Sequence, residues 1–163
     1  MKKVLTLIIL IFVFTIVDNS VMPFLAVYGY YPSLLFIFAL SYSIINDRWS
    51  ALGIGIITGV LQDIFFINAF GVNTLVNMLL CVLAGEIGRN LFKDKRLIPV
   101  CSIFGLTLLK GILILIILNI LHIQMNAYNI INIAIYSFIV AIFMYKCVYK
   151  LCKKDYMIRN WKF

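Results

Sequence analysis

Four ionisable side chains interrupt stretches of the sequence that are otherwise apolar: Asp18, Asp63, Glu86 and Lys110. Buried carboxylates and amines are groups that active sites use for acid–base chemistry and that membrane transporters use to hold ions. A charge near the centre of a lipid bilayer costs about 2.5–3.5 kcal/mol, so such residues usually face protein or water. Each of the four residues therefore needs a function or a partner.

The motifs that would give these groups a catalytic role are missing. The sequence has no phosphate loop, no G-x-S-x-G nucleophile elbow, no H-E-x-x-H zinc motif and no pair of carboxylates within one short segment. Its single histidine, His122, and its four cysteines do not have the spacing of a zinc site or a disulfide framework. We therefore predict a protein that is not an enzyme and that has no catalytic, metal-binding or cofactor-binding residues.

The composition places the whole chain in a lipid bilayer. Of its 163 residues, 64% are hydrophobic and 12% are charged, and the mean hydropathy is +1.09. Soluble domains are about 45–50% apolar and about 25% charged. Apolar stretches of spanning length predict an all-α, polytopic membrane protein that forms one domain over residues 1–163. The six predicted transmembrane helices cover about residues 4–22, 31–45, 50–67, 72–89, 97–121 and 128–149.

The basic residues predict the orientation of this bundle. All of the 14 lysines and arginines except Lys110 lie at the N-terminus, between the second and third spans, between the fourth and fifth, or near the C-terminus. Cytoplasmic segments carry an excess of basic residues, so both termini are expected in the cytoplasm. The net charge of +8 thus reflects topology and not nucleic-acid binding. The first span lacks an A-x-A-like cleavage site, which favours a retained anchor over a cleaved signal peptide.

Asp18, Asp63 and Lys110 are predicted at a similar depth. Each lies roughly 13–14 residues from the cytoplasmic start of its span, or about 20 Å at the helical rise. We therefore predict a buried ion pair of Lys110 with Asp63 or with Asp18. The alternative is that each charge lies beside a hydrated crevice or snorkels without pairing. Glu86 differs, because Arg89 follows it by one helical turn, and an ordinary interfacial pair is expected.

Small and polar residues predict close packing of the third and fourth spans. Gly55, Gly59 and Asp63 share one helix face, and small residues let membrane helices approach closely. Gly71 belongs to the short turn between the spans. The stripe expected to face them consists of Asn73, Asn77, Cys81, Ala84 and Gly88. We expect the two stripes to pack together, with the asparagine amides available to Asp63.

The same region carries a family resemblance. The segment G-x-x-x-G-V-L-Q-D from Gly55 to Asp63, followed by F-G-V-N-T-L from Phe70 to Leu75, resembles the rod-shape-determining MreD family. Pro32, which opens the second span, is similar to a proline that the family tends to have there. The motif covers about residues 53–75, whereas chain length, six spans and basic termini fit along the whole chain.

The resemblance implies a multi-pass protein of the bacterial inner membrane that belongs to the cell-elongation machinery for peptidoglycan synthesis. Its implied partners are a bitopic MreC-type protein and, indirectly, the MreB filament, a RodA-type glycosyltransferase and a class B penicillin-binding transpeptidase. The resemblance also implies a fold like that of the substrate-binding subunit of energy-coupling-factor transporters. It carries over no catalytic residues.

Two functions remain open at this point. The first is a non-enzymatic scaffold or regulator of wall elongation, which would contact partners and the lipid bilayer through helix faces. The second is a substrate-binding membrane subunit of a vitamin-type transporter, which would need a polar outer cavity that uses Asp63, Asn73 and Asn77. The candidate structural or partner-binding residues are Gly55, Gly59, Asp63, Gly71, Asn73, Asn77, Lys110 and Asp18.

Overall fold

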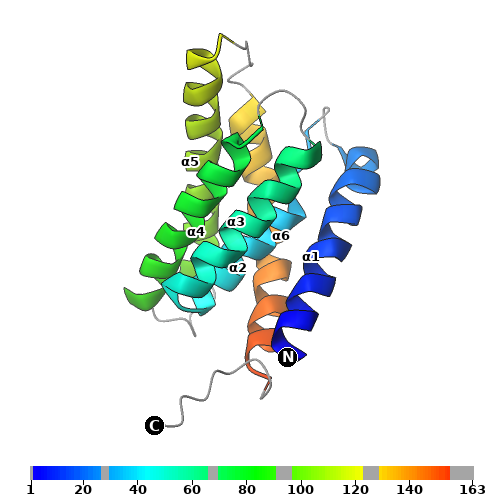
Figure 1. The fold of residues 1–163 in the computed structure, drawn as a ribbon, viewed down its shortest axis with the longest axis vertical. Helices are drawn as coiled ribbons and strands as arrows, with labels where there is room; N and C mark the ends of the chain where they lie inside the picture. Colours follow the sequence, from blue (N-terminus) through cyan, green and yellow to red (C-terminus); the bar gives the residue numbers. More distant parts are fainter. Residues whose placement is uncertain (1, 27–29, 66–69, 91–96, 123–128, 155–163) are drawn as a thin grey trace.

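The computed structural model describes residues 2–26, 30–65, 70–90, 97–122 and 129–154. Within these ranges, six α helices follow one another along the chain, with a short 3-10 helix after the first (Figure 1). Their bounds are α1 Lys2–Ser20, η1 Met22–Leu25, α2 Leu34–Ile45, α3 Arg48–Phe65, α4 Val72–Asn90, α5 Leu97–Ile120 and α6 Asn129–Cys152.

Each predicted span corresponds to one α helix, so the all-α class is confirmed. Among the described residues, α1, α4, α5 and α6 are the helices long and apolar enough to cross a membrane. α2 has only 12 residues, and α3 contains polar residues and glycines among its 18 residues. The count of six spans therefore stays a prediction, and so does the likeness to transporter subunits.

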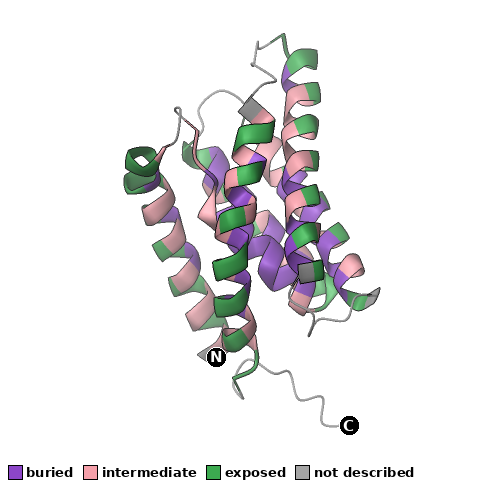
Figure 2. Ribbon diagram, turned by 180° about the vertical axis from the view of Figure 1, so that it is seen from behind, coloured by how far each residue is buried: buried purple, intermediate pink, exposed green. Residues whose placement is uncertain are grey.

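α2 forms the centre of the bundle. It begins after Pro32 and Ser33, and all its residues from Leu35 to Ile44 are buried. It packs against α1, α3, α4, α5 and α6, and Figure 2 shows the buried residues gathered at this centre. At 1.5 Å per residue α2 is about 18 Å long, well short of the roughly 30 Å of bilayer hydrocarbon. Protein, and not lipid, therefore covers its sides.

The outward faces of the surrounding helices are apolar. Large hydrophobic side chains are exposed on each of them, among them Ile8, Ile57, Leu79, Ile116 and Ile139. Soluble monomers rarely expose contiguous apolar surface on this scale. The outer surface is therefore one that lipid chains would cover.

The described basic residues near helix ends lie at one end of the bundle. α1 begins and α6 ends at the same end (Figure 1). There the side-chain amide of Asn46, after α2, lies 3.6 Å from the sulfur of Cys152. Arg48 opens α3 and Arg89 lies in the last turn of α4, so both belong to this end. We call it the basic end. The side of the membrane that it faces stays a prediction.

The α3–α4 hairpin packs through its glycines, as predicted. A Cβ atom on Gly55 would lie 2.9 Å from the carbonyl oxygen of Asn77 and 3.0 Å from the Cβ of Cys81. A Cβ atom on Gly59 would overlap the backbone of Thr74. The two helices can therefore approach this closely only because these positions lack side chains.

Two other glycines have different roles. Gly71 has a φ of +96°, a left-handed conformation that glycine adopts without strain, and it leads directly into α4. A Cβ atom on Gly88 would overlap the backbone of Ile44 at the end of α2. The predicted stripe on α4 therefore divides: its first half packs on α3, whereas Gly88 packs on α2.

We expect Gly59→Ala to destabilise the protein by about 1–3 kcal/mol, the usual cost of overpacking. Gly53 lies on the same helix, and a Cβ there would have no atom within 4 Å. Gly53→Ala is the matched control and should be neutral or stabilising, since alanine favours a helix over glycine by about 1 kcal/mol. The measurement is unfolding of the purified variants by SDS titration in detergent. Equal effects in both variants would contradict the close approach of α3 and α4.

Candidate functional site

Asp18 on α1 completes the first turn of α2. Its carboxylate accepts the backbone N–H groups of Leu34 at 2.7 Å and Leu35 at 3.0 Å, and the hydroxyl of Ser33 at 2.8 Å. The first N–H groups of a helix have no partner within it. Ser33 is the N-cap residue, and its oxygen accepts the N–H of Phe36 at 3.2 Å. The carboxylate also matches the positive end of the helix dipole.

Gln62 connects this cap to the interior of the bundle. Its amide nitrogen donates to the hydroxyl oxygen of Ser33 at 2.6 Å. Its amide oxygen accepts from the side-chain nitrogen of Asn77 at 2.8 Å and from the ammonium of Lys110 at 2.9 Å. Gln62 and its bond to Asn77 are buried, whereas its bonds to Ser33 and Lys110 are partly buried. We call the resulting series of hydrogen bonds the polar chain; its members are Lys110, Gln62, Ser33 and Asp18.

The direct ion pair predicted for Lys110 is wrong. Within the described residues, no ion pair joins Lys110 to Asp18 or to Asp63. Its ammonium instead donates to Gln62 and lies 4.0 Å from the centre of the Phe36 ring, where a cation is attracted to the ring face. The physical reason is that Gln62 lies between the opposite charges, so hydrogen bonds link them in place of direct contact.

The polar chain is balanced in charge. It has a cation at one end and a carboxylate at the other, with a neutral amide and a neutral hydroxyl between them. At every step a donor meets an acceptor, and aligned hydrogen bonds polarise one another most in a medium of low dielectric. Four helices, α1, α2, α3 and α5, are therefore tied together without a free charge in the interior.

Asp63 plays the same capping role for α4. Its carboxylate accepts the N–H of Asn73 at 3.0 Å, the N–H of Thr74 at 2.8 Å and the hydroxyl of Thr74 at 2.5 Å. Asp63 is buried beside this helix end. Of the two asparagines predicted as donors, Asn73 reaches Asp63 with its side chain as well as its backbone N–H, whereas the side chain of Asn77 binds Gln62. Each of the two carboxylates, Asp18 and Asp63, closes the start of a neighbouring helix.

A small cavity lies beside the cap of α2, between α1, α2 and α3. Its volume is about 40 Å³. A water molecule needs roughly 10–15 Å³ on this measure, whereas sites for small organic molecules usually measure about 300–1,000 Å³. The cavity can therefore hold a few water molecules and not a vitamin. Its lining residues with polar side chains are Thr15, Asp18, Asn19, Tyr31, Ser33 and Gln62.

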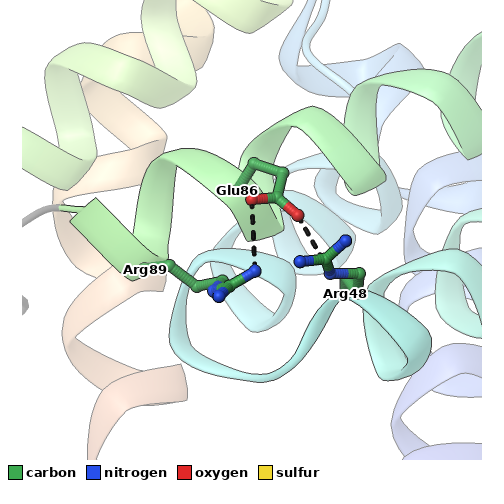
Figure 3. A network of polar contacts seen from close by, with 3 residues as sticks. All are labelled: Arg48, Glu86 and Arg89. Atoms are coloured by element: carbon green, nitrogen blue, oxygen red, sulfur yellow. Dashed lines mark hydrogen bonds and ion pairs between the residues drawn. The ribbon is translucent and has the colours of Figure 1, made fainter.

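Glu86 joins two arginines at the basic end (Figure 3). Its Oε2 atom lies 3.5 Å from Nη1 of Arg89, one turn along α4, which confirms the predicted pair. Its Oε1 atom lies 3.0 Å from Nε of Arg48, the first residue of α3. Arg48 was not predicted as a partner, because it comes from a different helix. The cluster thus links the start of α3 to the end of α4.

Three residues of the site were not predicted from the sequence: Gln62, Ser33 and Thr74. Ser33 carried a usable signal, because it follows Pro32 and precedes an apolar run, which is the pattern of a helix N-cap. Gln62 also carried a signal, because a polar side chain inside an apolar span needs a hydrogen-bond partner, as Asp63 beside it does. Thr74 had no signal, since threonines are common in membrane helices.

The arrangement suits holding helices in place better than performing a reaction. The carboxylates of Asp18 and Asp63 each accept hydrogen bonds from at least three donors. Over the ranges that the structure describes, no group of three His, Cys, Asp or Glu side chains could hold a metal ion. The sequence-predicted residues therefore form two separate structural groups, one around Asp18 and Lys110 and the other around Asp63.

A comparison with protein families places the chain. The family described as rod shape-determining protein MreD matches residues 1–155 of the 163. The chain belongs to the MreD family. The match extends beyond the end of α6 at Cys152, so membership rests on the whole bundle and not only on the glycine motif of α3. The MreD family functions in rod-shape determination, and with its long apolar helices this member is a membrane protein. No curated protein and no solved structure gives a significant match.

Proposed function

We propose that this MreD-family chain is a non-enzymatic scaffold of the bacterial cell-elongation complex. The observation that carries the proposal is the family match over residues 1–155. The use of the buried polar groups supports it. They bind one another and the starts of helices, so they stiffen the bundle and leave few groups to act on a substrate.

The scaffold would work from the inner membrane as a multi-pass protein with both termini in the cytoplasm. Its exposed apolar helix faces suit contact with the transmembrane segment of a bitopic, MreC-type partner. Through that partner it would act indirectly on the MreB filament, a RodA-type glycosyltransferase and a class B penicillin-binding transpeptidase. The basic end would face the cytoplasm, in line with the positive-inside rule.

The transporter alternative gains no support from the cavity beside Asp18. A volume of about 40 Å³ is far below that of a site for a vitamin. Asp63, Asn73 and Asn77, which such a site would use, are bound to other groups in the interior.

The test is depletion of the protein in its native bacterium, followed by microscopy. In a rod-shaped host we expect loss of rod shape, and restoration by the wild-type chain. A tagged chain should also co-purify with a bitopic membrane protein, whereas an unrelated multi-pass protein with the same tag should not. Normal rods with a nutrient requirement would overturn the proposal in favour of transport. In a host that is not a rod, co-purification replaces shape as the deciding result.

A further inference from the structure

Two guanidinium groups are held together at the surface of the basic end. Arg48 and Arg89 approach the carboxylate of Glu86 from two helices (Figure 3). The arginine side chains are each 52% exposed and that of Glu86 is 41% exposed. The proposed scaffold function does not use this cluster.

Most N–H donors of the two arginines have no partner within the part of the chain that the structure describes. A guanidinium group has five N–H donors in a planar fork. Arg48 uses its Nε atom on Glu86, and no other described residue binds its two terminal nitrogens. Among the described residues, Arg89 has only the 3.5 Å contact with Glu86. Two cations share one carboxylate, so the cluster keeps a formal charge of +1 on half-exposed arginine side chains.

The surroundings of the cluster match the headgroup region of a bilayer. Trp49, next to Arg48, is 78% exposed, and tryptophan is enriched where membrane and water meet. Farther along the same hairpin, α3 and α4 expose Ile57, Val60, Leu79 and Leu83, an apolar surface for acyl chains. The cluster thus combines positive charge with a nearby exposed tryptophan, on a hairpin whose outward side chains are apolar.

We propose that Arg48 and Arg89 bind the phosphate of an anionic phospholipid, with its acyl chains along the α3–α4 hairpin. The guanidinium fork matches the geometry of phosphate oxygens and binds them bidentately. Glu86 holds the two forks close together, so less side-chain freedom is lost when the lipid binds. The adjoining apolar face favours a lipid over free phosphate as the source of the ligand. The proposal does not depend on the scaffold function.

The test is native mass spectrometry of the purified chain in detergent with added phosphatidylglycerol. Arg48→Gln/Arg89→Gln should bind the lipid at least about tenfold more weakly, a loss of about 1.4 kcal/mol, because the charge-assisted hydrogen bonds to the phosphate are gone. The matched control is Lys146→Gln/Lys150→Gln, which removes the same charge from exposed positions near the end of α6. The control should bind like the wild type, and phosphatidylcholine should bind weakly to all three proteins.

Several results would overturn the proposal. One is wild-type lipid affinity in Arg48→Gln/Arg89→Gln. Another is an equal loss of lipid affinity in Lys146→Gln/Lys150→Gln, which would indicate non-specific attraction of the lipid to positive charge. Displacement of the lipid by millimolar inorganic phosphate would point to a phosphate site. Arg48→Lys/Arg89→Lys keeps the positive charge but lacks the guanidinium groups. Its lipid affinity should therefore lie between those of the wild type and the double glutamine variant. If the double variant does not fold, Arg48→Gln and Arg89→Gln are measured singly, and wild-type binding in both would contradict the proposal.

Discussion

Gln62→Leu should destabilise the protein by about 3 kcal/mol, because it leaves the buried amide of Asn77 and the half-buried ammonium of Lys110 without their acceptor. The change removes the acceptor of Lys110 and the donor to Ser33 in one step. Leucine is similar in size to glutamine, so packing alone does not account for a loss this large. The measurement is the SDS concentration at which the purified protein unfolds in detergent.

A second substitution tests whether the stability lost in Gln62→Leu comes from the broken polar chain and not from altered packing. Lys110→Met removes the orphaned charge and keeps a side chain of similar length, so it should restore much of the stability lost in Gln62→Leu. Lys110→Met should not restore the stability lost in Asp63→Ala, because Asp63 caps α4 and is not a member of the polar chain. A double variant no more stable than Gln62→Leu, or an equal rescue of Asp63→Ala, would contradict the polar chain.

Asp63→Ala is the other change with a large expected effect. It leaves two N–H groups and one hydroxyl at the start of α4 without their acceptor. Each buried group left unpaired costs about 1–3 kcal/mol, so we expect a loss on the order of 3 kcal/mol. Asp63→Asn keeps one acceptor oxygen and should lose about half as much. The same SDS titration measures both variants.

Asp47→Ala is the matched control for this change. Asp47 is exposed before α3, and the bond identified for it uses its backbone carbonyl, which accepts from Ala51 at 2.9 Å. Its replacement should change stability by no more than about 0.5 kcal/mol, as at most surface positions. Comparable losses in Asp47→Ala and Asp63→Ala would mean that the cap of α4 contributes little.

Hydrophobic length was sufficient to predict where the helices lie, because each apolar run is bounded by polar residues or by proline and glycine. It could not predict that α2 is enclosed by other helices. An apolar helix has the same composition whether lipid or protein covers it. One signal was present: the run from Leu34 to Ile45 is apolar on nearly every side, which is typical of a buried helix.

The glycine motif predicted the α3–α4 contact correctly because the contact is local and the turn between the helices is short. The partner of Lys110 could not be predicted in the same way. Equal depth along three spans does not say which spans are neighbours, and a search for opposite charges overlooks a neutral amide. Gln62 carries no charge that would mark it as this partner, although it stands beside Asp63 in the sequence.

The enclosure of α2 also bears on how a cell makes this protein. α2 leaves the ribosome second, but α6, which packs against it, leaves last. At about 5–20 residues per second, translation of the residues between them takes several seconds. During that time the nascent α2 has α1 and its capping carboxylate as a first neighbour and lacks its final cover. Biosynthesis must therefore reach the end of the chain before the middle of the protein is complete.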